Sequence, residues 1–206
     1  MSAGEASSVS DPGPELNRLW QAIASGDPAR AMPALAGLRS MDEPQATPLL
    51  MLGLEQSTFM IRSLACAGLG VKRSEAGWQA LERTLFHDDD ANVRAEAANA
   101  LASYGVARAW PHLRASFVAD GQWLVRCSIL SALAEQPEML GEHLLDLAQL
   151  ALADGDGTVR VGGAEILGRL VREGGDGAAR ARALLTGLQA DADHRVVAAA
   201  LDGLQR

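Results

Sequence analysis

One short pattern recurs along the chain at a nearly constant interval. In each copy an aliphatic residue is followed by arginine, and apolar residues stand one and two helical turns further on. The copies are Ile61-Arg62 with Leu69, Val93-Arg94 with Leu101, Val125-Arg126 with Leu133, Val159-Arg160 with Leu167, and Val196-Val197 with Leu204. Successive arginine positions lie 32, 32, 34 and 37 residues apart, with Val197 in the last arginine position. A period of this length predicts a stack of similar supersecondary units rather than an ordinary globule.

Each unit is predicted to consist of two helices, the second of which carries the recurring pattern on one apolar stripe. Asp90, Asp156 and Asp193 stand three residues before the aliphatic position, where a carboxylate can cap free helix N–H groups. Gly70, Gly105 and Gly174 stand near the expected helix ends, where a left-handed backbone is useful. The other helices are expected at residues 15–25, 28–39, 47–55, 77–86, 107–119, 139–153 and 177–190. Residues 1–14 are expected to be a disordered tail, and residues 15–206 one domain.

Composition agrees with a helical protein and excludes several functions. Ala and Leu are abundant and favour helix, whereas the aromatic content of 4% argues against a β-sandwich. The 18 basic and 26 acidic residues give a net charge of −8, which disfavours binding to nucleic acid or anionic lipid. No apolar run approaches the roughly 20 residues of a membrane span, and the N-terminus lacks the features of a secretory signal. We therefore expect a cytoplasmic protein without a membrane span.

The recurring second helix has the form Asp-x-x-Val-Arg-x-x-Ala-Ala-x-x-Leu, almost complete from Asp90 to Leu101. This pattern resembles the HEAT-like repeats of the phycobilisome lyase type, and the resemblance extends from about Gln45 to the C-terminus. Pro111 occupies the place where first helices of HEAT repeats often contain a proline. The resemblance implies an all-α fold, a right-handed α-solenoid (superhelix) of about four to six HEAT-like helical hairpins.

The periodic arginines allow two interpretations. In HEAT-like stacks this arginine commonly pairs with an aspartate at the start of a neighbouring second helix, which would place all four arginines in a structural ladder along the inner face. Alternatively, Arg94 and Arg126, which are central in the stack, turn outward and hold carboxylates such as the propionates of a tetrapyrrole.

The positions two and five residues after each arginine are expected to face the concave side, where solenoids bind extended partners. Glu96 and Asn99 represent this small, mildly acidic stripe, which either receives a partner or is simply solvated. Trp123 and Phe59 precede their aliphatic positions by two residues and are expected to be partly exposed. Such aromatic residues are candidate anchors for a partner or a bilin, with core packing as the alternative. Tyr104 belongs to the same group, whereas Trp78 and Trp110 are expected in the core.

The histidines and cysteines are the residues that could carry metal or redox chemistry. A HEAT-repeat hydroxylase that modifies hypusine resembles this fold and binds two irons through His-Glu dipeptides, but none of the four histidines here precedes a glutamate. We therefore expect no metal site. Cys66 and Cys127 lie two repeats apart, roughly 20 Å at about 10 Å per layer, which is too far for a disulfide. Cys127 beside Arg126 has either a lowered pKa or the properties of a small buried thiol.

The resemblance also implies a function. It suggests a non-catalytic binding protein of a cyanobacterium that handles phycobiliproteins or bilins, as a chaperone, a lyase-associated subunit or a phycobilisome degradation adaptor. Its partner would be a phycobiliprotein subunit or a second lyase subunit, with no tightly bound cofactor and at most transient contact with a phycobilin. As an enzyme, it would be a subunit of a phycobilin lyase. The alternative is a general scaffold, or an accessory factor for a metabolic or iron–sulfur assembly enzyme, unrelated to bilins.

Overall fold

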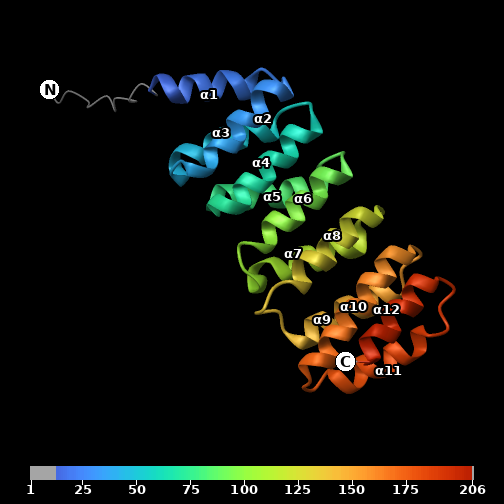
Figure 1. Ribbon diagram of the computed structural model, residues 1–206. Helices are drawn as coiled ribbons and strands as arrows, with labels where there is room; N and C mark the ends of the chain where they lie inside the picture. Colours follow the sequence, from blue (N-terminus) through green and yellow to red (C-terminus); the bar gives the residue numbers. More distant parts are fainter. Residues whose placement is uncertain (1–12, 206) are drawn as a thin grey trace.

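Helices account for all of the regular structure in residues 13–205, the part of the chain that the computed structural model describes (Figure 1). They are α1 (Pro14–Ala24), α2 (Pro28–Gly37), the short 3-10 helix η1 (Leu38–Ser40), α3 (Glu43–Leu54), α4 (Phe59–Lys72), α5 (Glu75–His87), α6 (Ala91–Ala102), α7 (Val106–Ala119), α8 (Trp123–Ala134), α9 (Gly141–Leu152), α10 (Gly157–Glu173), α11 (Ala178–Leu188) and α12 (His194–Gln205).

The helices form six hairpins in two layers. Each odd-numbered helix packs on the even-numbered helix that follows it, and each even-numbered helix from α2 to α10 also packs on the next even-numbered helix. Loops after odd-numbered helices lie along one edge of the stack, on the right in Figure 1, and loops after even-numbered helices lie along the other. The predicted all-α solenoid of helical hairpins is thereby confirmed.

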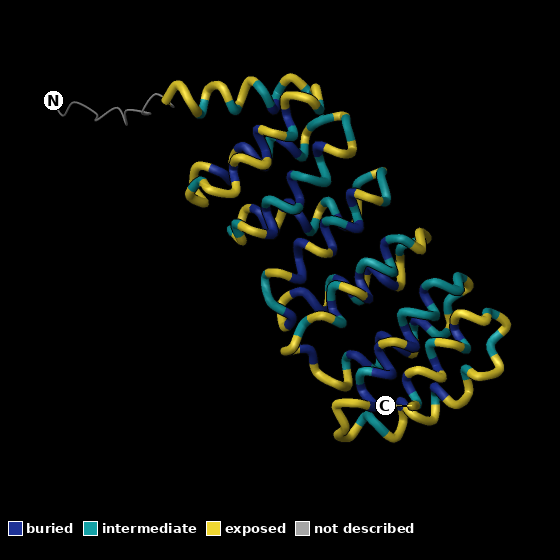
Figure 2. Tube along the Cα trace, in the orientation of Figure 1, coloured by how far each residue is buried: buried dark blue, intermediate teal, exposed yellow. Residues whose placement is uncertain are grey.

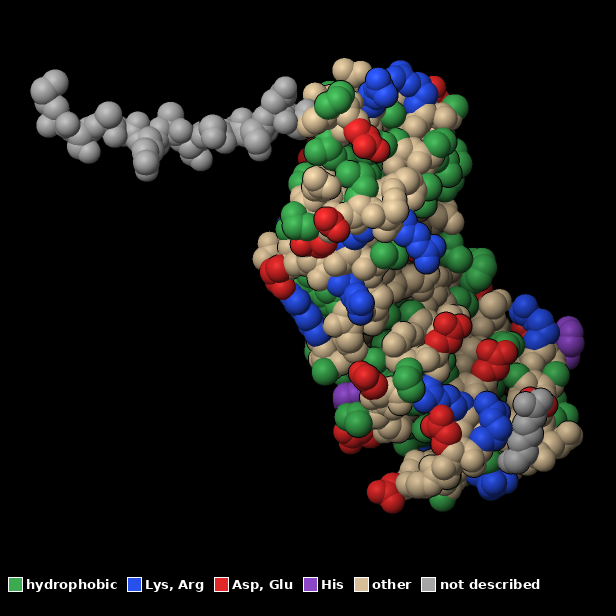
Figure 3. All heavy atoms as spheres, turned by 60° about the vertical axis from the view of Figure 1, so that its left-hand side comes forward, with side chains coloured by type: hydrophobic (Ala, Val, Ile, Leu, Met, Phe, Trp, Pro, Cys, Tyr) green, Lys and Arg blue, Asp and Glu red, His purple; other side chains and the backbone are tan. Residues whose placement is uncertain are grey.

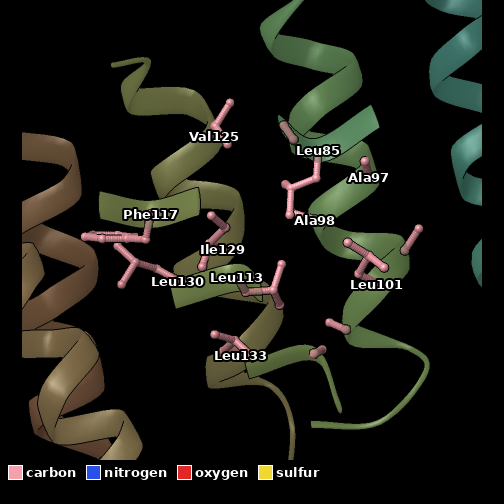
Figure 4. Packing of buried hydrophobic residues seen from close by; sticks show 14 of the residues in the cluster. Leu85, Ala97, Ala98, Leu101, Leu113, Phe117, Val125, Ile129, Leu130 and Leu133 are labelled. Carbon is pink, nitrogen blue, oxygen red and sulfur yellow. The ribbon is translucent and has the colours of Figure 1, made fainter. Parts of the chain in front are cut away.

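The hydrophobic core continues from hairpin to hairpin without interruption (Figure 2). Figure 4 shows how the repeated apolar positions meet: Leu101 of α6, Leu113 of α7 and Ile129 with Leu133 of α8 share one buried region. All four side chains are completely buried. Because a single hairpin cannot enclose its own apolar face, each unit depends on its neighbours for burial.

The outer layer of odd-numbered helices is joined by aromatic and charged side chains. Trp78 of α5 is buried and contacts His112 of α7 edge-on, with the guanidinium of Arg108 placed 4.0 Å from its ring centroid. Trp110 of α7 stacks on His143 of α9 at a centroid distance of 4.6 Å. The prediction that Trp78 and Trp110 belong to the core between repeats is confirmed.

Along the edge formed by loops after even-numbered helices, side chains of one repeat donate hydrogen bonds to backbone carbonyls of the repeat before it. Lys72 Nζ donates to the carbonyls of Arg39 and Met41, Ser103 Oγ donates to the Gly70 carbonyl at 2.7 Å, and Arg169 Nη1 donates to the Ala134 carbonyl. Carbonyls near a helix C-terminus lack intrahelical partners, so these bonds satisfy groups that the helices leave free.

The predicted caps are present at all three aspartates. Asp90, Asp156 and Asp193 accept hydrogen bonds from the backbone N–H two residues further on, at 2.7–2.9 Å. Gly105 and Gly174 adopt the expected positive φ of 108° and 75° at helix ends. The expectation for Gly70 was wrong, because it lies inside α4, where a Cβ would come within 2.9 Å of Ala100 Cα in α6.

Helix boundaries in the N-terminal part differ from expectation, most of all at the third helix. The third helix begins at Glu43 rather than residue 47, because Pro44 is tolerated in the first turn and Pro48 is accommodated inside the helix. The expected tail, residues 1–14, lies largely outside the described residues. Pro14 is described and begins α1.

Candidate functional site

The four periodic arginines form a regular ladder with aspartates of the next hairpin. Arg94 reaches Asp120 through Nε and Nη2, at 2.7 and 3.1 Å. Its Nη1 donates to the Asp88 carbonyl at 2.9 Å, within the loop that precedes its own helix. Corresponding pairs join Arg62 to Asp88 at 2.8 Å, Arg126 to Asp154 at 2.6 Å and Arg160 to Asp191 at 2.9 Å.

These pairs connect into one continuous chain of contacts. The carboxylate of Asp88 binds Arg62 and its carbonyl binds Arg94, while the carboxylate of Asp120 binds Arg94 and its carbonyl binds Arg126. The aspartates lie just before the second helices, so the ladder follows the edge of loops after odd-numbered helices rather than the inner face. It ends at Asp191 because Val197 replaces arginine in the last hairpin.

The ladder shifts the pKa values of its members in the direction expected for ion pairs. Burial alone would raise the pKa of Asp88 and Asp120, but hydrogen bonds from Arg62 and Arg94 and from backbone N–H groups hold both values below their usual range. Hydrogen bonds to Asp120 and Asp88 likewise raise the pKa of Arg94 and Arg62. These carboxylates are therefore ionised at neutral pH and are already bound to arginine.

The structure thus places Arg94 and Arg126 in the structural ladder, and neither guanidinium turns outward. Their side chains are each only 14% exposed and paired with Asp120 and Asp154. A carboxylate ligand at either arginine would have to displace an aspartate that is already bound. The structure offers no outward cation at these two positions.

Glu96 and Asn99 lie together on α6. Glu96 is half-buried and Asn99 is exposed. Burial raises the pKa of Glu96, and its hydrogen bond with Asn99 offsets only part of that effect. The pair gives the middle of the second-helix layer a polar, acidic character.

Trp123 and Phe59 are exposed, as predicted, with 46% and 40% of their surfaces accessible at the first positions of α8 and α4. Both lie on the ladder edge. Tyr104 does not belong with them, because its hydroxyl donates to the Leu69 carbonyl at 3.0 Å and its ring packs edge-on against Trp78. Tyr104 therefore joins hairpins rather than facing a partner.

Within the described residues, grooves open between neighbouring second helices. One of about 310 Å³ lies between α2 and α4 and is lined mainly by apolar residues, among them Leu35 and Leu64. One of about 420 Å³ lies between α8 and α10, and another of about 560 Å³ lies between α10 and α12. Arg172 and Glu165 line both of the grooves that flank α10.

The groove between α8 and α10 contains residues that the sequence did not indicate. Arg169 and Arg172 project from the last turns of α10, which at 17 residues is longer than the 12-residue α8 beside it. The repeat pattern ends at Leu167, so it gave no reason to select them. Apolar residues continue past Leu167 as Leu170 and Val171, which indicates in the sequence that this helix extends further.

The cysteines are both free. Cys66 is fully buried in α4, and burial raises its pKa. Cys127 lines the groove between α8 and α10, and burial raises its pKa more than the nearby Arg126 lowers it. The possibility of a lowered pKa for Cys127 is thereby corrected.

Charges are mixed on the side of the molecule shown in Figure 3, where Lys and Arg alternate with Asp and Glu. Within residues 13–205, no three His, Cys, Asp or Glu side chains lie together as metal ligands would. None of the helices described here has the length and apolarity needed to cross a membrane.

Fold and repeat geometry define the class of protein: an α-solenoid of helical hairpins joined by an arginine–aspartate ladder. Residues 47–134 match the family model of HEAT repeats. That segment covers hairpins α3–α4 to α7–α8, which hold the first two ladder pairs and Arg126. No curated protein sequence matches the chain.

Solved structures resemble this chain to different degrees. The complex of CpcE and CpcF of phycocyanin lyase from Nostoc sp. PCC7120 matches with a TM-score of 0.57 at 20% sequence identity, over 98% of this chain and 80% of the matched chain. Human deoxyhypusine hydroxylase in complex with glycerol matches with a TM-score of 0.41 at 16% identity, over 93% of this chain and 96% of that chain. The first likeness shows that nearly the whole chain has the fold of a phycocyanin lyase chain.

Proposed function

We propose that this chain is a non-catalytic HEAT-repeat binding protein that handles phycobiliproteins or bilins, as a lyase-associated subunit, a chaperone or a degradation adaptor. The observation that carries the proposal is the likeness to the phycocyanin lyase complex, which extends over 98% of this chain. A second helical subunit or a phycobiliprotein subunit is the partner.

The ladder supports a binding role rather than acid–base catalysis. Its carboxylates are ion-paired with arginine, and the pKa values of Asp88 and Asp120 are lowered. A general acid or base needs a pKa near the working pH and access to substrate, whereas these groups are ionised and engaged. We expect no turnover by this chain alone.

The ladder edge supplies a surface for a protein partner. Phe86 and Val118 each stand two residues before a ladder aspartate and are exposed, and Trp123 and Phe59 begin the adjacent second helices. Four large apolar side chains thus lie along one edge across three neighbouring hairpins. Exposed aromatic residues surrounded by polar groups are common anchors of interfaces.

Co-elution tests the proposal directly. The purified chain is mixed with an isolated phycobiliprotein and analysed by size-exclusion chromatography, and it is titrated with phycocyanobilin while the bilin absorption is followed. A stable complex or an absorption shift at micromolar concentration is expected. If neither effect is seen at that concentration, the proposal is ruled out, and a scaffold unrelated to bilins remains.

Variants at the exposed tryptophans locate the protein-binding surface. Trp123→Ala should weaken phycobiliprotein binding by roughly tenfold or more, because a truncated aromatic anchor typically costs that much. Trp20→Ala is the matched control, since Trp20 is also exposed, at 53%, but lies on α1 at the end of the stack. Equal effects of the two variants would exclude a specific role for the ladder edge.

A further inference from the structure

The groove between α8 and α10 has the size and lining of a small-molecule site. Its volume of about 420 Å³ is within the usual range of ligand pockets. The buried side chains of Leu130 and Ile166 contribute apolar surface, and Ser131 and Thr158 contribute hydroxyl groups. Such a lining suits an elongated, largely apolar ligand with a few polar groups.

The shape of the groove follows from the helices that form it. Gly162 allows close approach of α10 to α8, since a Cβ there would lie 2.9 Å from Leu130 Cδ1. Lining residues extend along α10 from Thr158 to Arg172, which corresponds to roughly 21 Å at 1.5 Å per residue. The groove is therefore long enough for an extended molecule.

Two arginines at the far end of the groove have different surroundings. Arg169 is held in place, because its Nε binds Glu173 at 2.6 Å and its Nη1 donates to the carbonyls of Ala134 and Gln136. Arg172 is exposed, and within residues 13–205 its guanidinium has neither a hydrogen bond nor an ion pair. It also borders the groove between α10 and α12, so its five donors are available where the two grooves meet.

Charged side chains of opposite sign lie at different positions along the groove. Glu165 lies in the middle of the groove and would repel a carboxylate, whereas Arg169 and Arg172 at the end would attract one. A guanidinium with free donors binds a carboxylate with two parallel hydrogen bonds. A ligand with an apolar body and a terminal carboxylate matches this order of side chains.

We infer that this groove binds an open-chain tetrapyrrole, with Arg172 bound to a propionate carboxylate and the apolar body lying along Leu130 and Ile166. The inference rests on the proposed function and assigns the ligand to residues of this chain. Arg172, rather than Arg94 or Arg126, is thereby assigned to the carboxylate, because the guanidinium groups of Arg94 and Arg126 are already bound to aspartates. The binding that we infer is non-covalent, and burial raises the pKa of the Cys127 thiol, which also lines the groove.

A pair of ligands tests the role of the carboxylate. The full chain is titrated with phycocyanobilin and with its dimethyl ester, which has no ionised propionate, and dissociation constants are taken from absorption changes. Arg172→Ala should weaken binding of the free acid roughly tenfold or more, because a charge-assisted hydrogen bond is lost, and should leave binding of the ester unchanged. Arg180→Ala is the control, an exposed arginine on α11 outside the grooves, and should affect neither ligand.

A second variant tests the groove itself. Ser131→Phe places a large side chain in the groove and should reduce binding of both the acid and the ester, at an unchanged melting temperature. Equal affinity of the wild type for acid and ester, equal effects of Arg172→Ala and Arg180→Ala, or unaltered binding by Ser131→Phe would each overturn the inference while leaving bilin binding intact. A wild type that binds phycobiliprotein but no bilin also overturns it and leaves the protein-binding part of the proposed function standing.

Discussion

Each ladder arginine makes two kinds of contact at once. Arg94 binds the carboxylate of Asp120 in the following hairpin and the carbonyls of Asp88 and Asp89 in its own. A lysine could not make both sets of contacts, because its donors radiate from a single nitrogen atom. The guanidinium therefore fixes the spacing of two hairpins as well as their charge balance.

Removing this arginine should destabilise the protein. Arg94→Ala would leave the nearly buried Asp120 without its cation, at a cost of about 2 kcal/mol, between the values for exposed and buried pairs. In thermal unfolding this corresponds to a decrease of roughly 4–8 °C. Arg83→Ala, on the exposed side of α5, should change the melting temperature little. Equal melting temperatures of the two variants would contradict a structural role for the ladder.

Removing the charge of Glu96 should have the opposite effect and stabilise the protein. Burial raises its pKa, which means that its ionised form is less stable in the folded protein than in the unfolded chain. Glu96→Gln should therefore raise the free energy of unfolding at pH 7, and the gain should disappear below the pKa of the unfolded side chain, near pH 4. Urea unfolding at pH 7 and pH 3.5 measures both values. A destabilised variant at pH 7 would mean that the Asn99 hydrogen bond outweighs burial.

Small residues set the interfaces that second helices form with one another and with the first helix of their own hairpin. Gly70 faces the backbone of α6, Gly53 faces Ala65 of α4, and Gly162 faces Leu130 of α8, each with no room for a Cβ. The helices can therefore approach closely at defined points. Elsewhere between α8 and α10, a groove remains open.

Two glycine variants separate packing from helix propensity. Gly70→Ala should destabilise the protein by about 1–3 kcal/mol, because the new Cβ would lie 2.9 Å from the Ala100 backbone and force α4 and α6 apart. Gly187→Ala, in α11 with nothing within 4 Å of its Cβ position, should stabilise it by about 0.5 kcal/mol. Chemical denaturation of both variants measures the difference. A Gly70→Ala protein as stable as the wild type would show that α4 and α6 can shift without cost.

The sequence predicted the elements well where a residue has one structural role. The recurring valine–arginine pairs located the second helices, and the three capping aspartates located their beginnings. The prediction failed where one residue type can have two structural roles. Glycine ends helices and also allows close packing, so Gly70 was assigned to the wrong role.

The candidate site was less predictable than the fold because it depends on relations between hairpins. The exposure of Trp123 and Phe59 followed from their position before the helix, which is a local property. The groove beside Arg172 depends on how far α10 extends past α8, and no repeat pattern encodes that distance. Local periodicity therefore predicted the stack but not the spaces within it.

At the scale of the whole molecule, the ladder links stability to pH. Hydrogen bonds from arginines and backbone N–H groups lower the pKa of the ladder carboxylates Asp120 and Asp191 below the value of about 3.9 in an unfolded chain. Outside the ladder, Arg195 lowers the pKa of the capping residue Asp193 to about 2. Carboxylates of this kind contribute their full stabilisation above the unfolded pKa and lose it as the pH falls through the folded pKa.

The free energy of unfolding should therefore decrease as the pH falls from about 5 to about 2. Denaturant titrations across that range measure the slope, and Arg94→Ala should make it shallower, because Asp120 then lacks the partner that lowers its pKa. A wild type equally stable at pH 5 and pH 2.5 would contradict a contribution from the ladder.

The ladder has a further consequence for how such a molecule changes in evolution. Each ladder guanidinium binds its own hairpin and the next one, and Arg62 and Arg94 meet their aspartates at the same separation of 26 residues. Loss or duplication of one 32-residue module would present each arginine with an equivalent carboxylate and each helix with an equivalent neighbour. The protein can accordingly grow or shorten by whole hairpins, which alters the reach of its binding surface without requiring a new set of contacts.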